Sequence, residues 1–177
     1  VGLNSSQRAN ARVIEKEFLA AGFGPPVIAA AIVNALAESA LNPNAVGDGG
    51  SSIGLFQLHE RGGGAGMSAA DRKDPTLNAR RIIEEVKRAS GFMRHVQAGE
   101  VNIGKLAAAF STYVERPADK PGNEIKRAAM ALRYFPLGVG GTGLISGGQS
   151  VPWGFWGLAV GVSLFTLWGV KRVVDRR

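Results

Sequence analysis

The sequence from residue 37 to residue 59 reads AESALNPNAVGDGGSSIGLFQLH, and it decides which fold the chain can adopt. One carboxylate, Glu38, stands in the last turn of a predicted apolar helix. The GDGG run at residues 47–50 lies between apolar segments, which predicts a short hairpin or an irregular turn. A compact Gly-Leu-Phe-Gln segment follows at residues 54–57. The stretch therefore predicts an acidic side chain where a buried helix meets a small β element.

The regions on either side of this stretch predict a mostly α fold. The helix that carries Glu38 is expected to open with Pro26 in its first turn and to end at Leu41, because the residue before a proline avoids helical angles. Apolar residues that recur every three or four positions predict four further helices. These are expected near residues 6–21, after Asp74-Pro75, at 103–110 and at 125–132, where Ile125, Ala128, Ala129 and Leu132 form the apolar face.

Three regions are predicted along the 177 residues. Residues 1–136 are expected to form one helical domain, since this length can bury a core of its own. Residues 137–150, LGVGGTGLISGGQS, are rich in Gly and Ser and predict a flexible linker. Residues 151–170 are apolar and uncharged, which predicts a transmembrane helix, and a basic tail continues to residue 177.

Aromatic and basic residues flank the predicted membrane helix. Trp153 and Trp156 stand at one end and Trp168 at the other, as in an interfacial aromatic belt. The cations that follow Trp168 place this end in the cytoplasm if a cytoplasmic membrane is crossed, and a buried helix of the main domain is the alternative. The N-terminal residues contain no apolar core of a signal peptide, which is compatible with removal of an initiator Met or of a longer leader.

Composition excludes several classes of chemistry. The chain has no cysteine, so disulfides, a thiol nucleophile and cysteine metal sites are all absent. His59 and His95 are too far apart for a local metal pair, and no metal or other cofactor is expected. The 21 Lys and Arg exceed the 14 Asp and Glu, giving a net charge of +7 that suits an anionic polymer. No run combines basic with aromatic residues, so no nucleic-acid specificity is expected.

The motifs resemble those of a known group of enzymes. Residues 38–45 fit the E-S-x-x-N-P-x-A signature of lytic transglycosylases in the lysozyme superfamily, and GLFQ at 54–57 resembles their G-L-M-Q. The G-D-x-G at 47–50, followed by GLFQ, also resembles goose-type lysozyme. The similarity over about residues 20–136 is greatest to phage tail lysozymes, which add a later motif resembling YVERPAD at 113–119. The resemblance implies a lysozyme-like helical domain.

The position of Glu38 favours a proton on its carboxyl group, since a helix C-terminus is partly negative and apolar Leu36 and Leu41 are expected nearby. The resemblance implies that this group protonates the glycosidic oxygen between N-acetylmuramic acid and N-acetylglucosamine. A hydrolase normally needs a second carboxylate, about 5–5.5 Å away for retention or about 6.5–9.5 Å away for inversion. Asp48 is the candidate, although Asp-Gly is equally a plain turn signal.

Six residues are assigned to substrate binding: Ser39, Ser52, Gly54, Gln57, His59 and Tyr113. Gly54 is expected to let the backbone approach a helix or a sugar closely. Gln57 has an amide that can bind an N-acetyl group, with internal bonding in the turn as an equal alternative. For Tyr113, a position in the hydrophobic core and a position lining the cleft are equally compatible with the sequence. Arg116 is expected to form a structural ion pair with Glu115 or Asp119.

Two positions depart from the family patterns. Goose-type enzymes place a further Asp two residues after the Gln, where this chain has His59, for which a surface position is the commoner interpretation. Transglycosylases carry A-A-Y-N-A-G where residues 108–112 read AAFST. The first departure weakens the case for an inverting hydrolase, and the second weakens a direct transfer of transglycosylase subsites. Because transglycosylases need no second carboxylate, the 1,6-anhydro product is slightly favoured.

A domain that cuts the cell wall, joined to a membrane segment, predicts a phage particle component. The enzyme is expected in the virion, as a tail or internal ejection component that contacts other tail or capsid proteins. It would cut peptidoglycan strands in the host periplasm during genome entry, with residues 151–170 in the inner membrane. The alternatives are a non-catalytic tail or ejection protein that binds glycan, and a bacterial or prophage lysin anchored at the inner membrane.

Overall fold

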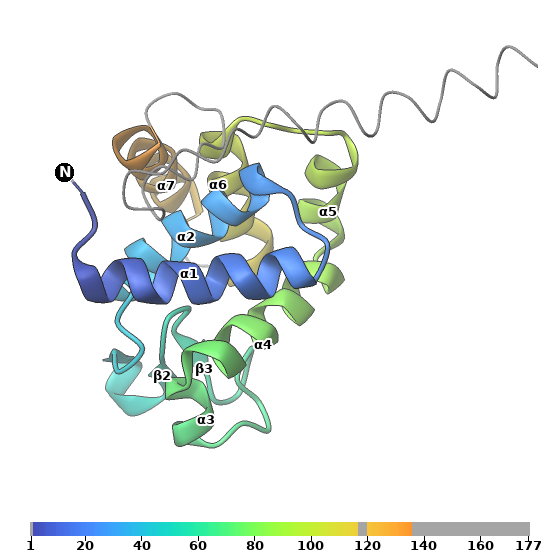
Figure 1. The fold of residues 1–177 in the computed structure, drawn as a ribbon. Helices are drawn as coiled ribbons and strands as arrows, with labels where there is room; N and C mark the ends of the chain where they lie inside the picture. Colours follow the sequence, from blue (N-terminus) through green and yellow to red (C-terminus); the bar gives the residue numbers. More distant parts are fainter. Residues whose placement is uncertain (1, 117–119, 136–177) are drawn as a thin grey trace, which may run out of the picture. The chain divides into compact units, whose positions relative to one another are not determined.

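The computed structural model describes residues 2–116 and 120–135 of the chain. These residues are mostly helical, with one small sheet (Figure 1). In chain order the elements are α1 (Ser5–Ala20), α2 (Pro25–Ser39), β1 (Val46–Gly47), η1 (Asp48–Gly50), β2 (Ser52–Ile53), β3 (Leu58–His59), α3 (Ala69–Lys73), α4 (Pro75–Arg88), α5 (Ser90–Gln97), α6 (Ile103–Phe110), η2 (Ser111–Glu115) and α7 (Lys120–Tyr134).

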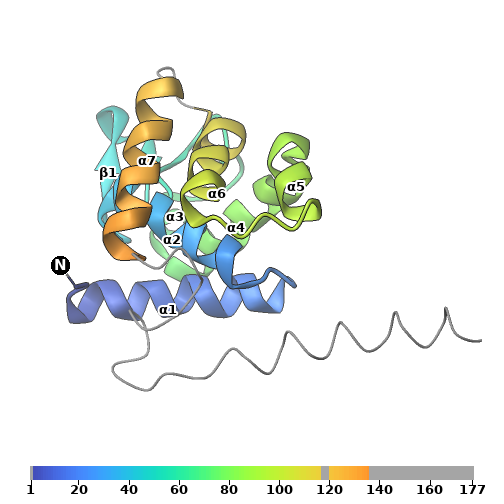
Figure 2. The ribbon, with the colours of Figure 1, turned by 90° about the horizontal axis from the view of Figure 1, so that it is seen from above.

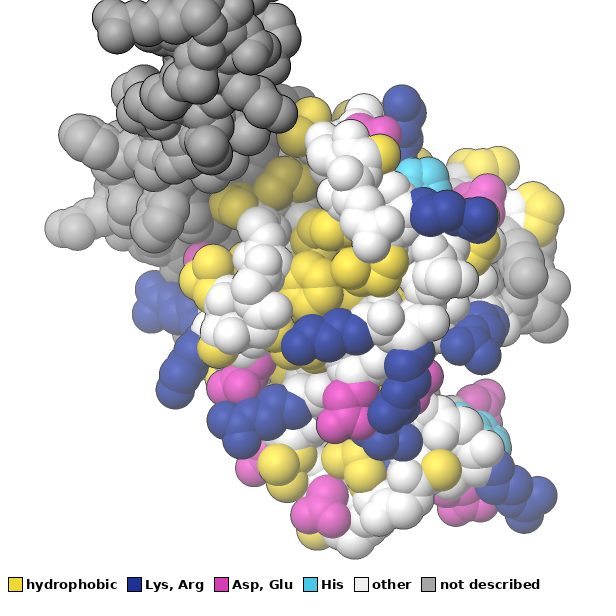
Figure 3. Space-filling model, turned by 90° about the vertical axis from the view of Figure 1, so that its right-hand side faces the viewer, with side chains coloured by type: hydrophobic (Ala, Val, Ile, Leu, Met, Phe, Trp, Pro, Cys, Tyr) yellow, Lys and Arg dark blue, Asp and Glu magenta, His cyan; other side chains and the backbone are white. Residues whose placement is uncertain are grey.

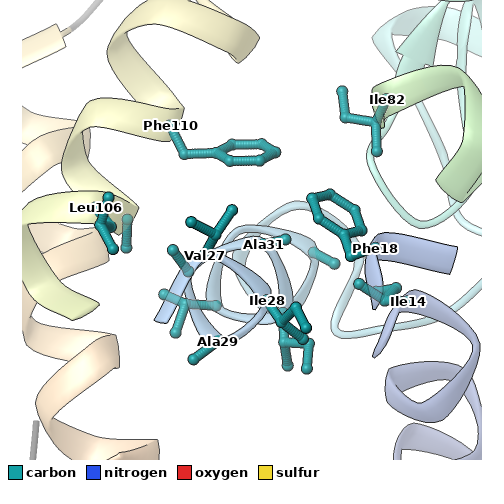
Figure 4. Packing of buried hydrophobic residues seen from close by; sticks show 14 of the residues in the cluster. Ile14, Phe18, Val27, Ile28, Ala29, Ala31, Ile82, Leu106 and Phe110 are labelled. Carbon is teal, nitrogen blue, oxygen red and sulfur yellow. The ribbon is translucent and has the colours of Figure 1, made fainter. Parts of the chain in front are cut away.

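Helix α2 is the centre of the helical packing. Every residue from Val27 to Leu36 is buried, because α1, α6 and α7 all pack against this helix. Figure 2 shows α2 between α1 and α6. In the close view, Ile14 and Phe18 of α1 lie on one side of α2 and Leu106 of α6 lies on the other (Figure 4). Burying each such side chain stabilises the fold by about 1.5–3 kcal/mol.

Side-chain caps explain where two of the predicted helices, α1 and α4, begin. Asn4 accepts the backbone N–H of Gln7 at 2.8 Å, while the Gln7 side chain accepts the N–H of Asn4, so α1 begins with a capping box. Asp74 accepts the N–H groups of Thr76 and Leu77 at 2.8 and 2.9 Å and begins α4, as Asp74-Pro75 predicted. These bonds satisfy backbone donors that a helix start leaves without partners.

The end of α2 differs from the prediction. The helix ends at Ser39, not Leu41, because Ala40 and Leu41 adopt left-handed angles with φ of 53° and 59°. This turn buries the Leu41 side chain and lets its N–H donate to the Ala35 carbonyl at 3.3 Å. Asn10 of α1 in turn donates to the Leu41 carbonyl at 2.9 Å. The chain therefore leaves the helix early because α1 offers a polar partner at this point.

The expected β element is present as a three-stranded antiparallel sheet in the order β1-β2-β3. Val46 pairs with Ile53, and Ile53 pairs with Leu58. The buried Arg72 of α3 supports the sheet, since its Nη1 donates to the carbonyls of Ser51 at 2.6 Å and Leu58 at 3.1 Å. Strands of two residues cannot hold themselves together, so these bonds to a neighbouring helix are a large part of their support.

Gly54 lies directly against the junction of α3 and α4. Its φ is +91°, and a Cβ at this position would overlap the backbone oxygen of Arg72 and the amide nitrogen of Asn78. The buried Asn78 amide donates to the Arg72 carbonyl at 2.8 Å and accepts the N–H of Phe56 at 3.1 Å. The close approach that Gly54 allows is thus an approach to a helix, which holds the GLFQ segment in place.

The face that α7 buries is not the predicted one. Its buried residues are Arg127, Ala131 and the following Phe135, which recur every four positions. Ile125 and Leu132, assigned to the apolar face, are 71% and 67% exposed. Helix α7 is rotated so that Arg127 points inward, where it forms ion pairs with Glu38 and Glu115.

The predicted linker at 137–150 and the predicted membrane helix at 151–170 lie outside the described residues. Within residues 2–116 and 120–135, no helix is both long enough and apolar enough to cross a membrane. The three-region division of the chain therefore stays a prediction.

Replacing Gly54 by alanine is expected to destabilise the domain more than any exposed glycine replacement. Gly54→Ala adds both left-handed strain and a collision with the α3–α4 junction, and should lower the free energy of unfolding by about 3 kcal/mol or more. Gly49→Ala is the matched control, because Gly49 has φ +65° but open space around its Cβ, so it should cost only about 1 kcal/mol. Urea unfolding followed by circular dichroism measures both. Equal losses would contradict the close approach.

Candidate active site

Glu38 lies in the last turn of α2 with its side chain 27% exposed. One of its oxygens, Oε1, accepts a hydrogen bond from Nη2 of Arg127 in α7. The sequence predicted an environment of helix carbonyls and apolar side chains that favours the protonated acid. That expectation did not include the nearest partner, which is the guanidinium of Arg127.

Arg127 is the centre of a buried polar cluster. Its side chain is only 6% exposed, and Nη2 contacts Glu38 and also Glu115 Oε2, the latter at 3.0 Å. Its Nε donates to Asn34 Oδ1 at 2.8 Å. We call Glu38, Arg127, Glu115 and Asn34 the arginine cluster. It joins α2 to η2 and α7, two consecutive elements that are distant from α2 in the sequence.

Asn34 explains how the guanidinium is held. This residue is fully buried in the middle of α2, and its amide donates to the carbonyls of Ala30 at 2.8 Å and Ala107 at 3.1 Å. Both donor hydrogens are used, so the amide oxygen must face Arg127. Asn34 therefore holds the guanidinium at Nε, while Nη2 contacts the carboxylates of Glu38 and Glu115.

Glu115 reaches the cluster because η2 is wound more loosely than an α-helix. Arg116 ends this turn with a left-handed φ of 57°, and its N–H donates to the Ser111 carbonyl at 2.9 Å, five residues back. A π-helical turn of this kind adds one residue per turn and changes the direction in which the following side chains point. Arg116 itself donates to the Tyr113 carbonyl at 3.2 Å, and Glu115 is bonded to Arg127 instead. Asp119, the other predicted partner of Arg116, lies outside the described residues.

Burial raises the pKa of Glu115 to about 7 from its ordinary value of 4.5. The positive charge of Arg127 lowers this pKa and the negative charge of Glu38 raises it, but burial is the largest cause. The side chain is 9% exposed, and its Oε1 makes no hydrogen bond with any described residue. The nearby Ser111 hydroxyl lowers the pKa least among these neighbours. Glu115 is therefore a carboxyl group that holds a proton close to neutrality.

A pocket of about 300 Å³ opens beside Glu115. It is lined by Phe56, Gln57, Leu58, His59, Gly62, Gly63, Ile82, Glu85, Val114, Glu115 and Arg116. The pocket thus lies between the end of the small sheet, α4 and η2, and two of the predicted binding residues, Gln57 and His59, face it together. Glu38 does not line it but meets Glu115 through Arg127.

The predicted second carboxylate, Asp48, lies on the exposed turn η1 with a left-handed φ of 49°. Its Oδ2 accepts the hydroxyl of Ser52 at 2.5 Å, so the structure brings these two predicted residues together. Among the described residues, no hydrogen bond or ion pair joins Asp48 to Glu38. A catalytic role for Asp48 stays a prediction.

Other predicted binding residues make internal bonds. The Ser39 hydroxyl donates to the Leu55 carbonyl at 2.8 Å, and the Gln57 amide donates to the carbonyls of Ala45 at 3.2 Å and Gly54 at 3.0 Å. Ser39 thereby ties the end of α2 to the GLFQ segment. The amide nitrogen of Gln57 is thus engaged in internal bonds of the turn, which was the predicted alternative to binding an N-acetyl group.

His59 and Tyr113 both reach the surface, at different places. His59 lines the pocket, and its Nδ1 accepts the N–H of Arg61 at 3.1 Å. Tyr113 is exposed, and its ring lies over Gly91 of α5 with the His95 ring 6.3 Å away between centroids. Aromatic faces of this kind can stack on sugars, so both assignments stay open to test.

The charged surface on the α5 side of the molecule carries both signs. Figure 3 shows basic and acidic side chains intermixed across this face. Some of them pair along α4, where Arg81 contacts Glu84 at 2.9 Å and Arg88 contacts Glu85 at 3.0 Å. Exposed pairs of this type contribute little to stability, about 0.3–0.5 kcal/mol each.

Residues 9–137 match the phage tail lysozyme family. The match spans well over half of the 177 residues. The chain belongs to this family. No curated protein sequence matches the chain. The match begins at residue 9, inside α1, and extends past the end of α7, so the arginine cluster lies entirely inside the phage tail lysozyme domain.

Sequence reasoning missed three members of the cluster of this lysozyme domain. Asn34 could have been identified from the sequence, because it is a single polar residue inside a ten-residue buried run of α2. Glu115 was noted within the later motif but paired with the wrong arginine. Arg127 gave no local signal, since its partner Glu38 lies 89 positions away.

The buried Glu115 predicts that the domain loses stability as the pH rises. The folded state keeps a proton on this group up to about pH 7, whereas the unfolded chain releases it near 4.5. Stability is therefore full below 4.5 and falls between 4.5 and 7, by about 3 kcal/mol. Glu115→Gln removes the titrating group and should flatten this fall. Thermal and urea unfolding from pH 4 to 8 measure it, and parallel curves for the two proteins would contradict the assignment.

Proposed function

We propose that this protein cleaves the β-1,4 glycosidic bond between N-acetylmuramic acid and N-acetylglucosamine in peptidoglycan. Glu38 is the acid that protonates the glycosidic oxygen. The observation that supports this role is its placement: a partly exposed carboxyl group at the end of a buried helix, supported from within by Arg127 and Asn34. Membership of the phage tail lysozyme family supports the substrate class.

The arrangement of Glu38 suits acid catalysis in two ways. Its helix end is held by the Ser39 bond to Leu55 and by the Asn10 bond to Leu41, so the carboxyl group has a fixed position. Its partial exposure leaves room for a substrate oxygen, which a fully buried carboxyl group would not. A general acid placed in this way accelerates bond cleavage by about 10²–10⁴.

The fate of the cleaved sugar depends on a second group. In a lytic transglycosylase the 6-hydroxyl of the muramyl residue attacks its own C1, so no second carboxylate is needed. In a hydrolase a carboxylate activates water or attacks C1 itself. We propose the 1,6-anhydro outcome, because this chain has His59 where goose-type enzymes place a further Asp, and the anhydro route needs no second carboxylate.

The proposed setting is the virion, with the enzyme acting on the host wall in the periplasm during genome entry. Residues 151–170 are proposed to anchor the protein in the inner membrane, and other tail or capsid proteins are proposed as partners. Two alternatives remain from the sequence: a structural tail protein that binds glycan without cutting it, and a lysin of bacterial or prophage origin at the inner membrane.

Removing the proposed acid tests the reaction. Glu38→Gln keeps the size and the hydrogen bond to Arg127 but cannot donate the proton, so peptidoglycan clearing in a zymogram should fall by about 10²-fold or more. Glu84→Gln, on the exposed side of α4, is the control and should clear as wild type does. A wild-type protein that binds sacculi but clears none of them supports the structural alternative.

Replacing the proposed second carboxylate separates the two products. Asp48→Asn retains an oxygen that can accept the Ser52 hydroxyl, so the turn should be preserved. For a transglycosylase we expect activity within about threefold of wild type and anhydro-muropeptides in the mass spectrum of the digest. A loss of about 10²-fold together with reducing-end products only would show a hydrolase that uses Asp48.

A further inference from the structure

Helix α7 presents an apolar stripe on the outside of the domain. Ile125, Leu132 and Val101, which lies just before α6, are the three most exposed large hydrophobic side chains of the described residues. Ala129 is also exposed, and it lies on the same face as Ile125 and Leu132 because positions four and seven residues apart line one side of a helix. Apolar side chains that gather on the surface of a domain mark a place that contacts something else.

The stripe continues into a groove between α7 and α6, which lie side by side (Figure 2). Thr112, just after α6, is bonded to Glu124, whereas a Cβ at Gly104 would lie 3.7 Å from the Cα of Ala128. The two helices are therefore antiparallel, and Val101 lies at the same end of the pair as the last turn of α7. The groove has a volume of about 390 Å³ and a mostly apolar lining.

Positive charges border the stripe on both sides. The helical repeat places the exposed Lys126 and Arg133 along one edge, and Lys105 of α6 lines the groove at the other edge. The two acidic side chains nearby have partners, since Glu124 is bonded to η2 and Glu100 pairs with Lys105 at 3.6 Å. An apolar stripe bordered by cations is the pattern with which a helix lies on an anionic membrane surface.

The place of α7 in the chain favours a membrane as the occupant of this surface. Helix α7 is the last helix that the structure describes, and residue 151, the first of the predicted membrane segment, follows residue 135 by 16 positions. A chain of 16 residues spans at most about 55 Å. With residues 151–170 in a bilayer, the domain is thus tethered to lipid through the same helix that carries the stripe.

We propose that the outward face of α7 docks the domain on an anionic lipid surface, and we call Ile125, Lys126, Ala129, Leu132 and Arg133 the docking face. The apolar side chains enter the headgroup layer, and the cations contact lipid phosphates. This inference rests on the membrane setting proposed above and requires no cleavage of glycan.

Docking leaves the candidate active site uncovered. Arg127 lies on the opposite, buried face of α7 and holds Glu38 from inside the domain. Each basic side chain near an anionic surface strengthens binding about fivefold, so Lys126 and Arg133 together favour anionic over neutral lipid by about 25-fold. The contact therefore orients the domain on the bilayer while Glu38 stays accessible.

The test uses the full chain reconstituted into phosphatidylcholine vesicles with and without phosphatidylglycerol. Because the chain has no cysteine, one introduced cysteine carries a fluorophore at a chosen position. Ala129→Cys places it in the docking face, and Ala70→Cys is the matched control, an exposed alanine of α3 at the opposite end of the domain from α7 (Figure 1). We expect brominated lipids to quench the label at residue 129 several times more than the label at residue 70, and most strongly with phosphatidylglycerol present.

Charge reversal tests the role of the cations. Lys126→Glu combined with Arg133→Glu should lower docking on anionic vesicles by about tenfold or more, so that quenching at residue 129 falls to the value at residue 70. Lys73→Glu combined with Lys87→Glu is the control, because it changes two exposed cations of α3 and α4 and alters the net charge equally. This second pair should leave the quenching at residue 129 unchanged.

The outcomes separate docking from the other proposals. Equal quenching at residues 129 and 70, in a protein that floats with the vesicles in a density gradient, overturns docking and leaves the membrane anchor intact. A protein that does not float with the vesicles overturns both. An Ala129→Cys protein that forms a disulfide-linked dimer and shows no lipid quenching assigns the face to a second copy of this chain. Loss of clearing in the zymogram concerns Glu38 and bears on none of these results.

Discussion

Arg127 places a positive charge inside the helical domain, and three elements meet where this charge is neutralised. A buried guanidinium is tolerated only when its donors have partners, and here Asn34, Glu38 and Glu115 provide them. Removing Arg127 would leave both carboxyl groups without a positive partner, and breaking a buried pair in this way typically costs about 3–5 kcal/mol. The end of α2, the turn η2 and the orientation of α7 are therefore coupled through a single side chain.

This coupling explains two irregular features together. The helix α7 turns its arginine inward and leaves Ile125 and Leu132 exposed, which an apolar pattern alone would not allow. The loosely wound η2 directs Glu115 toward the same guanidinium. Both features cost stability locally, and π-helical turns are common at functional sites. Burial is the largest cause of the raised pKa of Glu115, and the negative charge of Glu38 raises it further.

The small sheet depends on a second buried arginine of a different kind. Arg72 donates to the backbone carbonyls of Ser51 and Leu58 and forms no ion pair with a described carboxylate, so it supports the backbone of the small sheet. Together with Asn78 and Gly54 it fixes the GLFQ segment against α3 and α4. The bond from Ser39 to Leu55 then links this segment to the helix end that carries Glu38. The position of Glu38 is thus set by polar contacts on both sides of the helix end that carries it.

The sequence by itself determined the local features. Caps such as Asp74, the apolar run of α2 and the glycine turn all act over a few residues, and they predict α2, α4, the small sheet and the position of Glu38 in the last turn of α2. Only the tertiary structure decided which charges meet. Glu38 and Arg127 lie 89 positions apart, and pairing at that separation depends on how packed helices face one another. Local periodicity assigned α7 the wrong inner face, because the buried face follows from the packing of α7 against distant elements and includes Arg127 in place of Ile125 and Leu132.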